Sequence, residues 1–247
     1  LSGVALTGDR FFYPNPLESL NGGRRSEWFG CACCPSNIAR FIPAVPGYQY
    51  AVKDDNVYVN LYMASKANFN VDGTDVEMIQ TGDMPWSGDI KIQVNPAKAD
   101  EFDIKVRIPG WANNEPVPGN ILYHYAEVDN NKPVVKVNGV VVEEEIESGY
   151  ITIEKEWKRG DEISISLPMT VHKVVSSDSI VTNIGKIALQ RGPIVYCAEG
   201  IDFADRKIND LIVDINGQFT PELVTNQMGR MVELNGKAKH TKRTIDG

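Results

Sequence analysis

The sequence lacks any hydrophobic run that could cross a membrane as a helix, which takes about 18 consecutive apolar residues. It also lacks a basic stretch followed by an apolar one at its start, the pattern of a secretory signal peptide. Basic residues are in the minority: 25 Lys and Arg stand against 33 Asp and Glu, for a net charge of −8. Because an acidic surface repels phosphate backbones, we expect neither a nucleic acid nor a membrane as a partner.

Histidine is scarce, and internal repeats and low-complexity tracts are absent. The three histidines, His124, His172 and His240, are isolated and lack the spacing of metal ligands, so we interpret them as surface or strand residues. The first residue is Leu1 rather than Met, from which we expect a longer parent protein whose compartment this end does not reveal. The 247 residues, 42% of them hydrophobic, suffice for a buried core and for one or two domains.

Short alternating strands fill the sequence from Tyr48 to about residue 200. The runs "NVYVNLYMAS", "DIKIQVNP", "EFDIKVRIPGW" and "RGDEISISLPM" each place apolar residues at every second position. Asn138-Gly139 lies between two β-branched runs and predicts a tight hairpin. About nine such strands predict a mainly β fold, an antiparallel β-sandwich. Beyond Ile201 we expect one more strand and a frayed polar tail.

The first 47 residues differ from this pattern. Residues 1–35 show no sustained periodicity and predict a long ordered loop. A short helix should follow, with Ser36 as its N-cap, with Ile38, Phe41 and Ile42 on one face, and with Pro43 and Pro46 ending it. We therefore divide the chain into residues 1–47 and a sandwich region of residues 48–247, the latter built as one sandwich or as two small β units.

Three of the four cysteines, Cys31, Cys33 and Cys34, lie within four positions. A disulfide between the adjacent Cys33 and Cys34 would be an awkward ring, and a closed zinc site would need a second Cys-x-x-Cys pair that the chain lacks. Structural packing and a metal site completed by ligands outside the chain, with one thiolate serving as a nucleophile, both stay open. The fourth cysteine, Cys197, lies in the apolar run "PIVYCA" and is predicted to be a buried, inert strand residue.

The segment "RSEWFGCACCPSNIAR" resembles the cysteine segment of the bacterial β-L-arabinofuranosidases of glycoside hydrolase family 127, formerly domain of unknown function 1680. "FFYPNPL" upstream, and "VRIPGWA", "GYITIEKEWKRGDEISISLPM" and "GKIALQRGPIVYCAE" downstream, occur in the order expected of the same family. The resemblance covers most of residues 1–200. The matching positions in the cysteine segment are Arg25, Trp28, Phe29, Cys31, Cys33, Cys34, Pro35, Asn37 and Arg40.

This resemblance implies a retaining glycosidase with a cysteine nucleophile, which is an exception to the usual pair of carboxylates. Cys33 would attack the anomeric carbon, and Cys33 and Cys34 would be two of four zinc ligands. A glutamate and a cysteine would complete the zinc site, and a further glutamate would be the acid/base. All three would lie upstream of this chain, in an α/α-barrel domain to which residues 1–47 would form the end.

The resemblance also implies a substrate, an arabinofuranoside-containing plant glycan, and a partner, the preceding barrel domain. Trp28 and Arg25 are candidates for the wall of the substrate pocket. With two of four ligands and no acid/base residue, the chain alone should bind zinc weakly or not at all and should be inactive. The alternative is a non-catalytic β-sandwich that binds carbohydrate or a protein partner.

Three further features have plainer interpretations. The acidic run at residues 143–147 predicts a solvated strand end, since like charges in a block favour water. Trp111 at a strand end is predicted to pack across the sandwich rather than to stack on a sugar. Arg191, before Gly192-Pro193, is predicted to anchor a turn.

Overall fold

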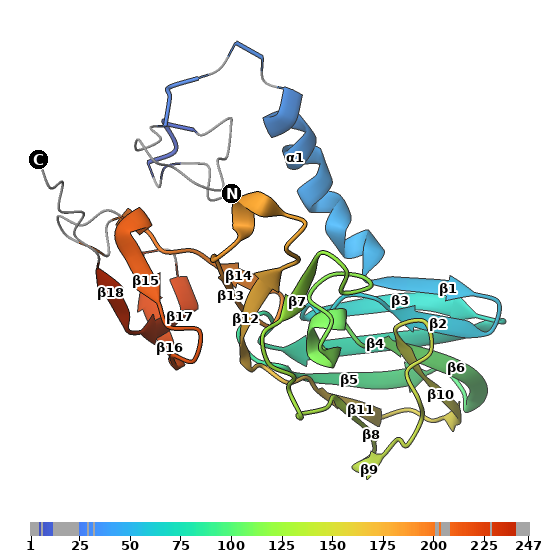
Figure 1. Ribbon diagram of the computed structural model, residues 1–247. Coiled ribbons are helices and arrows are strands. Elements are labelled where there is room, and N and C mark those ends of the chain that lie inside the picture. Colours follow the sequence, from blue (N-terminus) through green and yellow to red (C-terminus); the bar gives the residue numbers. More distant parts are fainter. Residues whose placement is uncertain are drawn as a thin grey trace, which may run out of the picture. The chain divides into compact units, whose positions relative to one another are not determined.

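A computed structural model describes residues 5, 7–11, 25–28, 30–31, 33–200, 203, 208–227 and 229–240, without the side chains of residues 34, 35 and 209. The chain splits into two compact units, Leu1–Tyr48 and Gln49–Gly247. Figure 1 shows the helices and strands of both.

The first unit contains helix α1 (Cys33–Ala44) followed by the 3₁₀ turn η1 (Val45–Tyr48). The prediction that Ser36 caps this helix is wrong, because α1 begins three residues earlier. Pro35 fits in the first turn, where the missing N–H of a proline costs nothing. Pro43 lies inside the last turn, and the helix ends one residue beyond it. Among the described residues before Cys33, the regular pairing is one isolated bridge between Phe11 and Ser26.

The second unit begins with the two sheets seen in Figure 1, and their buried residues form one core. The first sheet has the order β1-β2-β6-β10: β1 (Tyr50–Lys53), β2 (Asn56–Val59), β6 (Asp100–Arg107) and β10 (Tyr150–Trp157). The second has the order β3-β4-β5-β11-β8-β9: β3 (Ser65–Val71), β4 (Thr74–Gly82), β5 (Asp89–Pro96), β11 (Asp161–Ser166), β8 (Val134–Val137) and β9 (Val140–Val141).

The alternation in the sequence explains which side chains enter this core. Ile92 and Ile163 lie opposite each other on β5 and β11, and both are fully buried. The predicted hairpin forms between β8 and β9, with Asn138 at φ 51° and Gly139 at φ 85°, as a tight turn of this kind requires. The antiparallel sandwich is thereby confirmed, with one exception, because β2 runs parallel to β6.

The third sheet draws its strands from two distant parts of the sequence. Its order is β14-β13-β12-β7: β14 (Ile194–Tyr196), β13 (Ala188–Arg191), β12 (Val171–Ser176) and β7 (Tyr123–Tyr125). Three of these follow one another along the chain, but β7 comes from the connection between β6 and β8. That connection leaves the first sandwich, adds one strand to the edge of the third sheet and returns.

The last part of the chain holds more strands than the one expected. Two further pairs form: β15 (Leu211–Val213) with β18 (Ala238–His240), and β16 (Phe219–Asn226) with β17 (Gly229–Gly236). Residues 238–240 are therefore in a strand rather than frayed, and residues 241–247 lie outside the described part. Arg230 on β17 pairs with Asp83, the residue that follows β4.

The structure confirms the predictions for Trp111 and Arg191 and contradicts the one for Cys197. Trp111, in the 3₁₀ turn η2 (Gly110–Asn113), is half-buried and packs against the core. Arg191 Nη1 donates to the carbonyl oxygen of Trp86 at 3.0 Å, as an anchor of a turn would. Cys197, however, is exposed and not buried, because β14 ends at Tyr196 and the thiol follows it in an irregular segment.

Within the described residues, no helix has the length and apolar character needed to span a membrane.

Candidate functional site

The cysteine segment leads directly into α1. Cys31 lies in the irregular stretch before the helix, and Cys33 is its first residue. Both thiols are exposed. Cys34 is the second residue of α1, and its side chain is not among those described. The amino-terminal end of a helix favours negative charge, which suits a thiolate at this position.

Short-range contacts hold the first two turns of this helix. The Ser36 hydroxyl donates to the carbonyl oxygen of Cys33 at 3.0 Å. Arg40 donates to the side-chain oxygen of Asn37 one turn away. Ser36 therefore acts inside the helix, directly on the backbone of Cys33, instead of capping it from outside.

The predicted pocket residues precede the helix. Trp28 is 59% exposed, and its ring meets the Phe11 ring edge to face, with centroids 5.3 Å apart. Two backbone hydrogen bonds of 2.8 Å between Phe11 and Ser26 hold the two segments together. Arg25 is exposed, one residue before this bridge. Both side-chain types suit a sugar, since an indole ring stacks on it and a guanidinium donates hydrogen bonds to it.

The described part of the chain contains no cluster of three or more His, Cys, Asp or Glu that could hold a metal ion. Thiolates are nonetheless good donors for Zn²⁺, so the donor chemistry of Cys33 and Cys34 fits that ion, while the number of donors does not complete a tetrahedral shell.

A second polar centre lies in the third sheet and was not predicted. The side chains of His172 on β12 and Asp129 are both about nine-tenths buried, with Nε2 and Oδ2 3.8 Å apart. The Tyr125 ring on β7 stacks on the imidazole, with centroids 3.9 Å apart. A cavity of about 290 Å³ borders the pair; its lining includes Ala126, Asp129, Asn131, Thr170, His172 and Lys173.

Burial and hydrogen bonding set the charges of this centre. Burial lowers the pKa of His172, an effect that the nearby Asp129 carboxylate partly offsets, so the imidazole favours its neutral form. Burial opposes ionisation of Asp129, but hydrogen bonds from Thr170 and Asn131 outweigh it and lower the pKa of that carboxyl. Burial also raises the pKa of Tyr125 to about 12.

This centre joins two segments of the fold. The side-chain oxygen and nitrogen of Asn114 bond the backbone N–H and C=O of Asp129, at 2.7 and 2.9 Å. Nothing in the sequence links "VDNN" with "TVHK" forty residues later, because only the pairing of β7 with β12 brings them together. His124, His172 and His240 all lie in strands, on β7, β12 and β18.

Comparison with known proteins shows that this fold and its cysteine segment are those of a class of glycoside hydrolases. Three family models match in order along the chain: "Beta-L-arabinofuranosidase, GH127 catalytic domain" at residues 1–47, "GH127 middle domain" at residues 56–169, and "Glycoside hydrolase family 127 C-terminal domain" at residues 171–235. The chain belongs to glycoside hydrolase family 127.

Individual relatives agree with the family. The chain is 32% identical over 218 residues to a non-reducing end β-L-arabinofuranosidase of Bifidobacterium longum subsp. longum, covering 82% of this chain and 30% of that protein. A solved GH127 β-arabinofuranosidase is 41% identical with a TM-score of 0.88, over 97% of this chain and 37% of the other. A GH127 β-L-arabinofuranosidase from Geobacillus stearothermophilus is 31% identical with a TM-score of 0.84, over 98% and 37%.

The chain thus spans about a third of the length of these relatives.

Proposed function

We propose that this chain is the carboxyl-terminal part of a retaining glycoside hydrolase that releases L-arabinofuranose from β-linked glycans, with Cys33 as its nucleophile. The observation that carries the proposal is the position of Cys33. Its thiol is exposed at the first residue of α1, inside the segment that matches a catalytic-domain model, residues 1–47.

The chemistry required of Cys33 is that of covalent catalysis. Its sulfur attacks the anomeric carbon and displaces the glycosidic oxygen, and water then releases the sugar from the sulfur. Each displacement inverts the anomeric carbon, so the two together retain its configuration. The attacking group must be a thiolate, because a neutral thiol is a much weaker nucleophile. The helix dipole at the start of α1 favours that form.

A bound Zn²⁺, held by Cys33 and Cys34 together with ligands from outside this chain, would supply further stabilisation of the thiolate. We assign Ser36 a positioning role, because its hydroxyl donates a hydrogen bond to the carbonyl oxygen of Cys33 and so holds the first turn of the helix. A carboxyl group must protonate the departing oxygen, and we place it outside this chain, together with most of the substrate pocket.

Trp28 and Arg25 are proposed to form part of the wall of the pocket. Trp28 is 59% exposed, and its indole is of the kind that stacks on sugar rings. Because the chain would supply two of four zinc ligands and no acid/base carboxyl group, the 247 residues should be inactive by themselves.

The test is a set of serine variants in the full-length parent. Cys33→Ser should abolish turnover, because a serine hydroxyl stays protonated near neutral pH and binds zinc poorly. Cys34→Ser should lose bound zinc, and activity with it. Cys197→Ser is the matched control: its thiol is exposed and outside the catalytic segment, so turnover should be unchanged.

Three results would overturn the proposal. A folded, zinc-loaded Cys33→Ser enzyme with a near-normal rate would do so, as would a trapped intermediate on a carboxylate instead of on Cys33. A parent protein that contains no zinc and cleaves no arabinofuranoside would favour the alternative, a binding module.

A further inference from the structure

Asparagine followed by glycine is the sequence most prone to spontaneous deamidation, because glycine leaves its own backbone nitrogen free to attack the asparagine side chain. The sequence contains four such pairs, at residues 21, 138, 216 and 235. Asn21 lies outside the described residues. The other three lie in turns or strands with different surroundings, so the structure can separate them.

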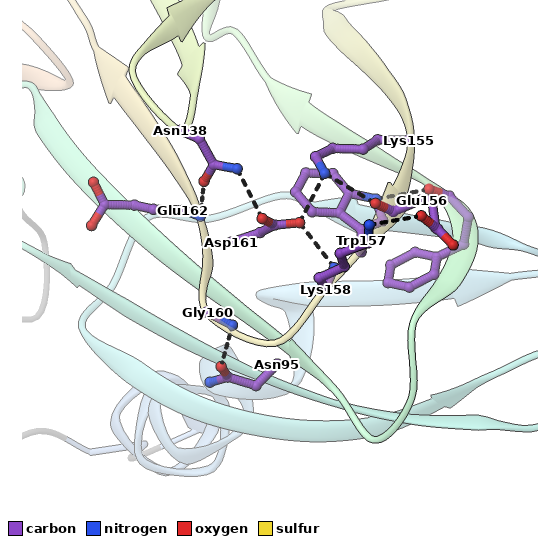
Figure 2. Close-up of polar contacts among 10 residues, drawn as sticks. Asn95, Asn138, Lys155, Glu156, Trp157, Lys158, Gly160, Asp161 and Glu162 are labelled. Atoms are coloured by element: carbon purple, nitrogen blue, oxygen red, sulfur yellow. Dashed lines mark hydrogen bonds and ion pairs between the residues drawn. The ribbon is translucent and has the colours of Figure 1, made fainter.

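Asn138 is held at both ends of its amide. Its Oδ1 accepts the backbone N–H of Glu162 at 2.9 Å, and its Nδ2 donates to Asp161 Oδ1 at 2.8 Å (Figure 2). Asp161 is itself fixed, because Lys155 Nζ and the backbone N–H of Lys158 both contact its other oxygen at 2.9 Å. The amide cannot turn toward Gly139 without breaking two hydrogen bonds.

Asn235 is held less tightly, yet its glycine is covered. Its Nδ2 donates to Glu222 Oε2 at 2.9 Å across the β16–β17 pair. The ring of Phe219 lies against Gly236, so closely that a Cβ on that glycine would be 2.4 Å from the ring. The ring hinders any movement of the Gly236 nitrogen toward the Asn235 side chain.

Asn216 differs from both. It is exposed in the turn between β15 and β16, and among the described residues its side-chain amide makes no hydrogen bond; its backbone N–H is bonded to Asp214 Oδ1 at 2.9 Å. The Gly217 N–H donates to the carbonyl oxygen of Asp214 at 2.8 Å, a single bond in an exposed turn.

Of the three described pairs, we propose that Asn216 is the site of spontaneous deamidation in the folded chain, and that the surroundings of Asn138 and Asn235 suppress the same reaction there. The Gly217 nitrogen loses its proton and bonds to Asn216 Cγ, while the bond from Cγ to Nδ2 breaks and ammonia departs. Water then opens the cyclic imide at either carbonyl, which gives aspartate or isoaspartate. Solvent water is the only other reactant, and no oxidation or reduction occurs.

The product has a definite effect on the turn. Either form adds one negative charge, and isoaspartate also inserts an extra carbon into the backbone between Ile215 and Gly217. The turn hydrogen bond from Gly217 to Asp214 then no longer has the right spacing, so the start of β16 should loosen.

The experiment is incubation of the folded 247-residue protein in mildly alkaline buffer, followed by digestion in mild acid and mass spectrometry of the three peptides. Asn216 should convert roughly 2- to 10-fold faster than Asn138, because two side-chain hydrogen bonds must break at Asn138 and only the Gly217 N–H bond at Asn216, and each bond slows the reaction by roughly 2- to 10-fold. In concentrated urea the three rates should converge, since all three pairs have the same local sequence chemistry.

Two variants separate the causes. Gly217→Ala should slow conversion of Asn216 alone, because the added methyl group hinders attack by that nitrogen. Asp161→Ala should speed conversion of Asn138 alone, by removing the acceptor of its Nδ2. Equal rates at the three sites in the folded protein, fastest conversion at Asn138, or no conversion at Asn216 would each overturn the proposal. If Asp161→Ala fails to fold, the comparison of native and urea rates in the unmodified protein decides.

Discussion

Trp157 is the largest fully buried side chain of the core. Replacing it should lower the free energy of unfolding more than replacing any exposed aromatic side chain. Its side chain is 0% exposed, and its indole Nε1 donates to the carbonyl oxygen of Phe102 at 2.9 Å (Figure 2). Trp157→Phe removes this hydrogen bond and leaves a gap beside the Phe102 ring, whose centroid lies 6.2 Å away.

The magnitude follows from these two losses. A lost net hydrogen bond is worth about 1 kcal/mol, and the unfilled volume left by the smaller ring adds about 1–3 kcal/mol. We therefore expect Trp157→Phe to lower the free energy of unfolding by about 2–4 kcal/mol. Trp28→Phe is the matched control, because Trp28 is 59% exposed, and it should change stability by less than about 0.5 kcal/mol.

The assay is urea unfolding of the 247-residue chain, followed by circular dichroism so that the change in tryptophan content does not disturb the signal. The dependence of the unfolding free energy on urea should stay the same in all three proteins, since the surface exposed on unfolding hardly changes. A Trp157→Phe protein within about 0.5 kcal/mol of the parent would refute the burial of Trp157 in the core and its hydrogen bond to Phe102.

Three other outcomes are expected. The pKa of His172 and that of Asp129 are both lowered on folding, so the unfolded chain binds more protons in acid. The free energy of unfolding should therefore fall as the pH drops below the ordinary histidine pKa, and again near the ordinary aspartate pKa. His172→Gln should flatten the first fall, as measured by urea titrations at several pH values. Gly88→Ala should destabilise by about 1–3 kcal/mol, because the new Cβ would lie 2.0 Å from a backbone carbonyl oxygen, whereas Gly47→Ala meets open space and should be near neutral in the same assay. Cys197 should react with a thiol reagent in the folded protein, because it is exposed; full protection until the chain unfolds would contradict that exposure.

The sandwich was predictable because its information is local. Ile90, Ile92 and Val94 alternate with polar residues, and a strand with one buried face needs no more than that to be recognised. Asn138-Gly139 similarly fixes its hairpin by backbone preference alone. The boundaries were less predictable: α1 begins at Cys33 because Pro35 is tolerated in a first turn, whereas Ser36 resembles a cap by residue type only.

What the sequence could not reveal depends on contacts between distant segments. The His172–Asp129 centre exists because β7 joins β12, and no short-range pattern encodes that pairing. Cys197 was expected inside because its neighbours are apolar, but the strand ends one residue before it. For the cysteine segment, residue types and spacing left packing and catalysis equally open, and the family resemblance supplied the chemistry; the roles of Cys33 and Cys34 stay predictions.

The strand β7 has a consequence for how this protein can be divided. By sequence it belongs to the stretch matching the middle domain, residues 56–169, yet it hydrogen-bonds to β12 in the stretch matching the C-terminal domain, residues 171–235. A cut at residue 170 would leave β12 with an open edge and would leave the Tyr125 ring without the imidazole on which it stacks. The two stretches can be named separately, but the complete third sheet and the His172–Asp129 centre form only where both are present.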